Sequence, residues 1–327
     1  MSASIKTSFP RRAFIAGGCA IAGASVLPDF WKVNAMDSPF RVGVINDEIG
    51  QDFGRVCEVA AHEFGVQWME LRGMWDKNIL RLDDKEVDEA VRILKKNNLR
   101  VTDIASPLFK VDWKGAPISK FSPKGDSFHA DFTFDQQDEV LERSIELAKK
   151  FQTDRVRCFD FWRLDDVAPY RQAINEKLQK AAETLGKRGL ILILENEQEC
   201  NTATAAEAVK TLAAVPSPHF MLNWDPGNAA TMGEIPFPNG YALLPKDRIG
   251  HCHCKDVTKK SHGSGYEWAA VGRGIIDWVG QFSALKKDGY RFAVNLETHW
   301  QGGGTPEESS RQSWAGMKED LRKASAI

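Results

Sequence analysis

Short apolar runs alternate along this chain with longer segments in which apolar residues recur every three or four positions. A short run rich in Val, Ile, Leu and Phe predicts a buried β-strand, and the spacing of three and four predicts an amphipathic helix. Eight strands are expected, at 40–45, 68–71, 100–104, 155–159, 190–195, 220–223, 249–254 and 292–297. Helical patterns lie at 53–64, 87–94, 141–148, 174–185, 205–212, 278–285 and 314–321. The sixth connection, 226–246, is rich in Pro and Gly and has only a weak helical pattern.

This order predicts an α/β protein with a single-domain (β/α)8 TIM barrel at residues 36–327, because eight strand–helix units match such a barrel in order and length. By length alone, two smaller domains also fit. An open doubly wound sheet is the other alternative, but it offers no reason for eight units. The first strand leads into Asn46-Asp47-Glu48 and not into a Gly-rich phosphate loop, so a dinucleotide-binding fold has no support. Two long insertions, at 106–134 and 256–274, are expected to cover the carboxyl end of the barrel.

Residues 1–35 have the pattern of an export signal. Basic residues precede an uncharged, Gly/Ala-rich run at 13–28 that is too short and too rich in glycine for a good membrane span. The adjacent Arg11 and Arg12 resemble a twin-arginine motif, and Ala35 ends a small-residue cleavage site. We therefore expect a periplasmic protein that has no membrane segment after cleavage. An ordinary secretory signal or an uncleaved anchor is the alternative.

Composition narrows the classes of partner. Without the first 35 residues the chain has 39 basic and 44 acidic residues, so it lacks the basic footprint of a nucleic-acid-binding protein. Five scattered cysteines remain, with no CxxC pair, which predicts buried thiols instead of a disulfide framework. The expected partner is a small molecule, and a homo-oligomer is left open.

Four polar residues stand at the carboxyl ends of expected strands: Glu195, Asp225, His253 and Glu297. Each alternates with apolar neighbours, so each can point to one face of its strand. A barrel brings such strand ends together. Three carboxylates and one imidazole suit one hard or borderline divalent ion, such as Mn²⁺, Mg²⁺ or Co²⁺, and Zn²⁺ is also compatible.

The same residues carry a resemblance to a known family. The motifs are Leu194-Glu195-Asn196, Asn223-Trp224-Asp225-Pro226-Gly227-Asn228, His251-x-His253-x-Lys255-Asp256, Gly272-Arg273-Gly274-x-x-Asp277-Trp278 and Leu296-Glu297. Their succession resembles the xylose-isomerase-like TIM-barrel family of sugar phosphate isomerases and epimerases, which also includes proteins like the apurinic endonucleases, over about residues 40–300. The resemblance implies that Glu195, Asp225, His253 and Glu297 hold one metal ion, and that Glu195 and Glu297 are the catalytic residues that move the proton.

Five further residues are candidates for substrate binding: Glu70, His251, Lys255, Asn228 and Arg273. Three of them have a structural alternative, namely a core histidine for His251 and an ion-pair partner for Glu70 and Lys255. The sequence departs from the family at Asn228, where many members have His, and at Arg273, where many have Glu.

The expected function is a metal-dependent isomerase or epimerase that forms an enediolate on a keto-sugar or related polyol. A lyase or hydrolase of 3-keto-glycosides, or a keto-inositol dehydratase, is the main alternative on the same barrel. An apurinic endonuclease would need a three-zinc cluster, but the chain has only seven histidines and an acidic balance. A sugar-binding barrel without activity is the last alternative, and the intact ligand set disfavours it.

Overall fold

The computed structural model describes residues 36–123 and 130–327. The predicted export signal, residues 1–35, lies outside the described residues. No helix among the described residues is long and apolar enough to cross a membrane. The five described cysteines are buried and unpaired, which confirms their prediction as core thiols.

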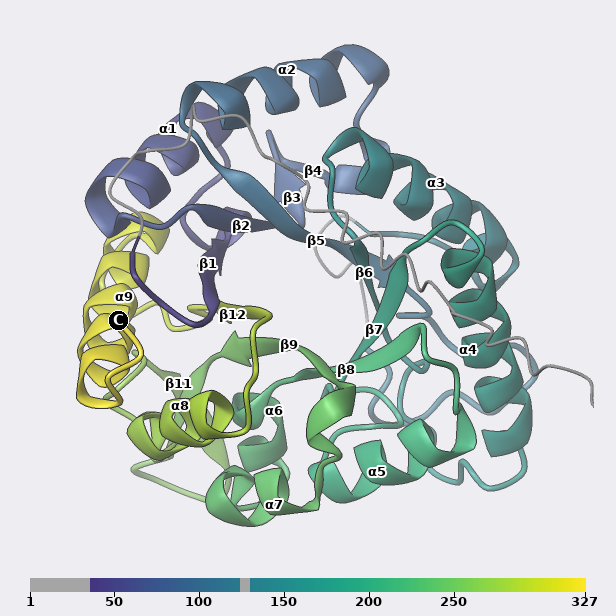
Figure 1. Ribbon diagram of the computed structural model, residues 1–327. Coiled ribbons are helices and arrows are strands. Elements are labelled where there is room, and N and C mark those ends of the chain that lie inside the picture. The colour runs from purple at the N-terminus through teal and green to yellow at the C-terminus, as the bar shows by residue number, and fades with distance from the viewer. Residues whose placement is uncertain (1–35, 124–129) are drawn as a thin grey trace, which may run out of the picture. The chain divides into compact units, whose positions relative to one another are not determined.

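Eight parallel strands close into a barrel with the order β1-β12-β9-β8-β7-β6-β5-β2, and helices surround them (Figure 1). The strands are β1 (Arg41–Ile45), β2 (Trp68–Leu71), β5 (Arg100–Leu108), β6 (Arg155–Cys158), β7 (Ile191–Glu195), β8 (Phe220–Trp224), β9 (Ile249–Cys254) and β12 (Ala293–Leu296). All eight predicted strands are confirmed. The third is longer than expected, because after a register shift Leu108 still pairs with Cys158.

All seven helical patterns are also confirmed. The helices are α1 (Phe53–Glu58), continued by a π-helix at Val59–Phe64, then α2 (Asp84–Lys96), α3 (Gln137–Lys150), α4 (Arg171–Gly186), α5 (Ala205–Ala214), α8 (Trp278–Lys287) and α9 (Pro306–Lys323). Capping boxes define the starts of α2 and α5, where Asp83 pairs with Glu86 and Thr204 with Glu207. The sixth connection holds only short pieces, α6 (Pro226–Thr231) and α7 (Tyr241–Leu243), with a π-helix at Pro236–Gly240 between them.

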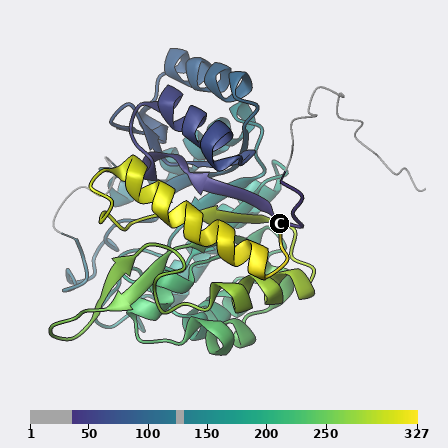
Figure 2. The ribbon, with the colours of Figure 1, turned by 90° about the vertical axis from the view of Figure 1, so that its left-hand side faces the viewer.

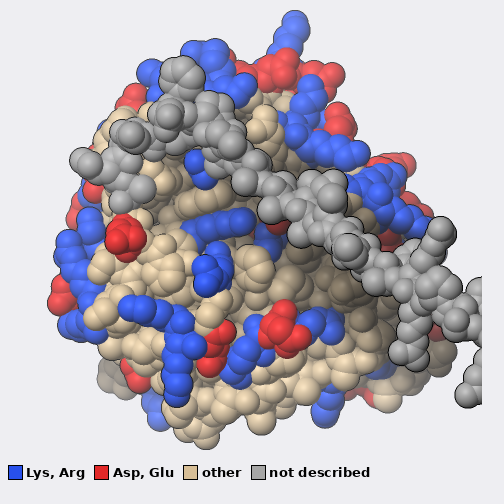
Figure 3. All heavy atoms as spheres, viewed as in Figure 1, with Lys and Arg blue, Asp and Glu red and all other residues tan. Residues whose placement is uncertain are grey.

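Two small hairpins are added to the barrel, β3 (Gly73–Met74) with β4 (Lys77–Asn78), and β10 (Asp256–Lys259) with β11 (Tyr266–Ala269). The β10–β11 hairpin projects at the end of the barrel opposite the C-terminus of the chain (Figure 2). Figure 3 shows the other end, where the strands begin and where several Lys and Arg side chains gather. The polar residues at the carboxyl ends of the strands therefore lie at the same end of the barrel as the β10–β11 hairpin.

The segment after the β10–β11 hairpin is held by one buried carboxylate. Asp256 accepts hydrogen bonds from the backbone N–H groups of Gly272 and Gly274, at 3.0 and 3.1 Å, and from those of Val257 and Ile276. A Cβ at Gly274 would lie 2.0 Å from Asp256 Oδ1, so only glycine fits there. Gly272 is required for a different reason, because its φ of +81° lies in the left-handed region. The backbone N–H groups on both sides of Arg273 face Asp256, and the Arg273 side chain is exposed.

Candidate metal centre

The four predicted metal ligands come together at the carboxyl end of the barrel. Glu195 ends β7, Asp225 follows β8, His253 lies in β9, and Glu297 follows β12. Each offers one ligand atom, and these atoms lie within 4.8 Å of one another. All four side chains are buried, with at most 2 % of their surface exposed. Local structure helps to place Asp225, because it is the N-cap of α6 and accepts a hydrogen bond from Asn228 N–H.

Three carboxylates converge on one nitrogen atom of His253. Its Nδ1 lies 3.2 Å from Glu297 Oε2, 3.4 Å from Glu195 Oε1 and 3.7 Å from Asp225 Oδ2. A ring nitrogen carries at most one hydrogen, so it can satisfy only one of these oxygens. Glu195 Oε2 and Asp225 Oδ2 are buried without a hydrogen bond, although each has a cation 3.0 Å away. One nitrogen and three carboxylate oxygens around a common point, two of the carboxylates incompletely satisfied, fit a divalent cation.

Glu70 lies behind His253 and orients its ring. The two Glu70 oxygens are 3.0 and 3.1 Å from His253 Nε2, on the side of the ring away from the three carboxylates. A carboxylate that accepts the Nε2 hydrogen directs the Nδ1 atom toward the cation position, as outer carboxylates do for metal-bound histidines in general. Burial lowers the pKa of His253, but the charges of Glu70, Glu195 and Glu297 outweigh burial and raise that pKa well above its usual value. A cation at Nδ1 would take the place of the second ring proton.

Replacing Glu70 with glutamine is expected to weaken metal binding by about 10- to 100-fold, because the ring of His253 loses the acceptor that orients it. Calorimetric titration of the metal-free protein with Mn²⁺ measures this change in affinity. Glu319, which is exposed on α9, provides the matched control, and Glu319→Gln should leave the affinity unchanged. Equal affinities for the Glu70 variant and the wild type would show that Glu70 does not support the site.

Basic side chains hold the two glutamates that the family resemblance marks as catalytic. Arg157 Nη1 lies 3.0 Å from Glu195 Oε2, and Arg72 Nη1 lies 2.9 Å from Glu297 Oε1. Lys255 Nζ lies 2.7 Å from Glu297 Oε2 and 3.0 Å from Asp225 Oδ2.

These neighbours decide the charge of the three carboxylates. Burial alone would raise the pKa of Glu195, but Arg157 and His253 outweigh it and hold that pKa below its usual range. Burial would also raise the pKa of Glu297, but the charges of Lys255 and His299 outweigh burial and hold that pKa well below its usual value. Asp225 differs, since burial raises its pKa in spite of Lys255. Both glutamates are therefore carboxylates at neutral pH.

The five residues predicted to bind substrate lie at different depths. Asn228 lines the cavity above the four ligands, and its Nδ2 donates to Asn196 O at 2.9 Å. Lys255 is buried against the ligands Glu297 and Asp225. Glu70 and His251 are fully buried below them, among other polar core residues. Arg273 is exposed and is not brought to the cavity.

The His251 ring is held by hydrogen bonds within the barrel core. Its Nδ1 lies 2.9 Å from Asn223 Oδ1, and its Nε2 lies 3.2 Å from Asp103 Oδ1. These contacts satisfy both ring nitrogens below the ligand layer. They match the alternative role given to His251 above, that of a hydrogen-bonded histidine in the core.

The cavity above the ligands has a volume of about 190 Å³. Among the residues that line it, Glu199, Trp268 and His299 were not singled out from the sequence. His299 Nδ1 lies 2.9 Å from Glu48 Oε1, and Glu48, Glu297 and His299 form a second group of ligand-type atoms beside the first. His299 lies two positions after Glu297, but β12 ends at Leu296 and the φ of His299 is positive, so the alternation of a strand could not indicate it. Trp268 belongs to the β10–β11 hairpin, for which the sequence had no signal either.

The comparisons with known proteins agree with this architecture. The family model of the xylose isomerase-like TIM barrel matches residues 59–320, and the chain belongs to this family. A search of curated protein sequences finds no match.

Solved structures share the fold at low sequence identity. A xylose isomerase-like TIM barrel protein from Mycobacterium smegmatis in complex with magnesium is 15% identical, with 88% of this chain and 98% of that one covered and a TM-score of 0.65. The probable 3-DHS dehydratase AsbF from Bacillus anthracis is 18% identical, with coverages of 85% and 98% and a TM-score of 0.64. The 3-keto-D-glucoside 4-epimerase YcjR from E. coli is 17% identical, with coverages of 86% and 99% and a TM-score of 0.61. At these identities the likeness shows the fold alone.

Proposed function

We propose that the protein is a divalent-metal-dependent isomerase or epimerase that acts on a keto-sugar or related polyol through an enediolate. The observation that carries this proposal is the pair Glu195 and Glu297, which approach His253 Nδ1 from β7 and β12, with β8 and β9 between those two strands. Both are ionised and both are held by an arginine. Two carboxylates placed on either side of a substrate carbon are what a reversible proton transfer requires.

The chain's own residues account for the proton movements in this proposal. One glutamate, as the carboxylate, removes the proton from the carbon beside the carbonyl. The other must carry a proton at that moment, taken up from water, and it delivers this proton to the same carbon or to its neighbour while the first glutamate keeps the proton that it removed. Arg157 and Arg72 keep the two carboxylates in place, and Lys255 holds Glu297 and Asp225 together. When bound, a divalent cation would polarise the carbonyl and stabilise the negative charge of the enediolate.

An unphosphorylated substrate is part of the proposal. The basic side chains of the cavity are already paired with carboxylates, Arg157 with Glu195 and Lys110 with Glu197. Arg72 contacts three carboxylates. Among the described lining residues, no group of cations is therefore available to a phosphate. A substrate without phosphate agrees with the proposed export, since free sugars and glycosides are the substrates that export suits.

A lyase that cleaves 3-keto-glycosides is the second candidate. It needs the same carboxylate to remove the proton, followed by loss of a group from the next carbon instead of reprotonation. A second pocket next to the cavity favours it, because a glycoside has a further ring to place there. Named relatives of similar fold include both an epimerase of a 3-keto-D-glucoside and a probable dehydratase.

Incubation of the Mn²⁺-loaded protein in D₂O with free ketoses and with 3-keto-glycosides tests the proposal, with NMR as the readout. Deuterium in recovered sugar without bond cleavage supports an isomerase or epimerase. Release of an alcohol from the glycoside supports the lyase. If neither deuterium exchange nor alcohol release were faster than with the Glu297→Gln protein, for every substrate, both candidates would be overturned.

A further inference from the structure

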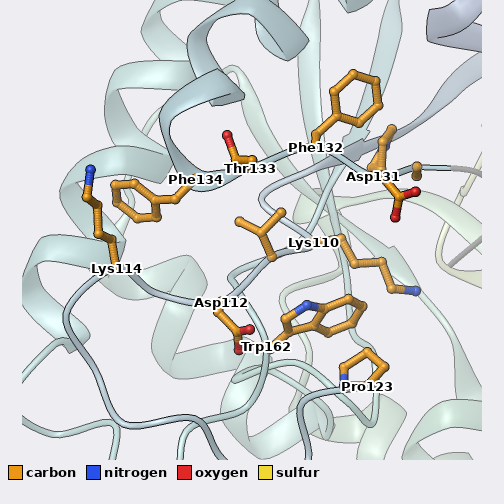
Figure 4. Close-up of a pocket in the computed structure, with 12 residues that line it drawn as sticks. Lys110, Asp112, Lys114, Pro123, Asp131, Phe132, Thr133, Phe134 and Trp162 are labelled. Atoms are coloured by element: carbon orange, nitrogen blue, oxygen red, sulfur yellow. The ribbon is translucent and has the colours of Figure 1, made fainter. Parts of the chain in front are cut away.

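A second pocket, with a volume of about 410 Å³, lies next to the cavity of the candidate metal centre. Figure 4 shows it between the loop that follows β5 and the segment leading into α3, with Lys110, Trp162, Asp131 and Thr133 among the residues that line it. Its size is within the range of ligand pockets in proteins. Neither the family motifs nor the proton transfer proposed above uses it.

The two cavities are adjacent. Pro107, Lys110 and Ala130 line both of them, so the pockets border each other at these residues. That side chain is fixed at the junction, because its Nζ lies 3.1 Å from Glu197 Oε2 and 4.4 Å from the ring centre of Phe159. A ligand that reaches from the four metal ligands past Lys110 would enter the second pocket.

The lining of the second pocket suits a neutral ring with hydroxyl groups. Trp162, Val111 and Phe134 provide apolar surface, and Asp112, Asp131 and Thr133 provide polar atoms around it. The lysines at its border are paired, Lys110 with Glu197 and Lys114 with Asp135. Apolar surface with a few placed polar groups is typical of small-molecule sites, and paired lysines disfavour an anionic ligand.

We infer that the substrate has two rings, and that the second pocket binds the ring which is not chelated at the metal centre. Resting on the proposed function, this inference narrows the substrate class to a neutral glycoside, with its oxidised sugar ring above Glu195 and Glu297. The linking oxygen atom then lies near Lys110 and Glu197. A sugar ring and an aromatic aglycone share the required chemistry, and the experiment separates them.

Filling the second pocket tests the inference. Asp131 is exposed and borders the pocket, so Asp131→Trp places a large side chain in it. The ratio of kcat/KM for a 3-keto-glycoside to kcat/KM for a one-ring ketose is expected to fall by at least about 10-fold. Asp138→Trp on α3, at a side chain that is 83% exposed and does not line the pocket, is the matched control and should leave the ratio unchanged. An unchanged ratio in Asp131→Trp would overturn the inference.

Binding without turnover separates this inference from the proposed function. Calorimetry with phenyl β-glucoside, cellobiose, methyl β-glucoside and glucose measures whether a second ring adds affinity. Tighter binding of phenyl β-glucoside or of cellobiose, lost in Asp131→Trp, supports the subsite and identifies the kind of ring, even if no deuterium exchange occurs. Equal affinities for one-ring and two-ring ligands would overturn the subsite and leave the proton-transfer proposal untouched.

Discussion

Replacing Glu297 with glutamine is expected to lower turnover by at least about 1000-fold, within the range that a general acid or base contributes. The change removes the negative charge that faces His253 Nδ1 at 3.2 Å, and a glutamine amide cannot take up the proton that a carboxylate accepts. The fold should persist, because the cations that contact Glu297 keep other partners. Lys255 retains Asp225, and Arg72 retains Asp47 and Glu48.

Steady-state kinetics on the substrate identified by the D₂O experiment, together with circular dichroism, measures both parts of this result. Glu319→Gln, an exposed change of the same type on α9, should match the wild type in each measurement. Turnover of the Glu297 variant within a few-fold of wild type, in a folded protein, would remove Glu297 from the catalytic residues.

Replacing His253 with alanine is expected to abolish stoichiometric metal binding and, with it, detectable turnover. His253 provides the only nitrogen atom of the four-residue group, and Glu195, Asp225 and Glu297 all face it. Removing a ligand itself should cost more affinity than removing an outer partner, for which the loss is about 10- to 100-fold. Elemental analysis after dialysis against Mn²⁺ should find about one ion per chain in the wild type and much less than one in the variant.

The control is His62→Ala, because His62 is exposed on the π-helix that follows α1. This variant should retain the ion and the activity. Full metal content in His253→Ala would show that the ion binds elsewhere, for example at the group formed by Glu48, Glu297 and His299.

Much of the fold could be predicted because the barrel repeats one simple pattern. Strands β7 and β8 are almost continuous runs of buried apolar residues, and a parallel strand covered on both sides requires such runs. The weak pattern at 226–246 was also informative, since only short helical pieces form there. The third strand was predicted too short, because its pairing with β6 continues to Leu108 only after a register shift, which no local pattern indicates.

The candidate ligands could be predicted because of the geometry of a parallel barrel. Parallel strands in a barrel deliver their carboxyl ends to one place, so a polar residue at each end of β7, β8, β9 and β12 can be assigned to a common site without knowing any side-chain position. Glu195, Asp225, His253 and Glu297 do lie together. The depth of Glu70 could not be predicted, because its place below His253 depends on how the strands of the closed barrel are tilted.

The sequence by itself determined the eight-stranded barrel, its family and the four strand-end residues that meet at its carboxyl end. These features could be predicted because periodicity and strand direction depend on residues that are close together along the chain. Only the tertiary structure decided which charges pair: Arg157 with Glu195, Arg72 with Glu297, and Glu70 with His253. It also decided that Arg273 faces solvent and that a second pocket opens beside Lys110. These features depend on loops and side chains that are distant along the chain, and their contacts follow from packing and not from any local pattern.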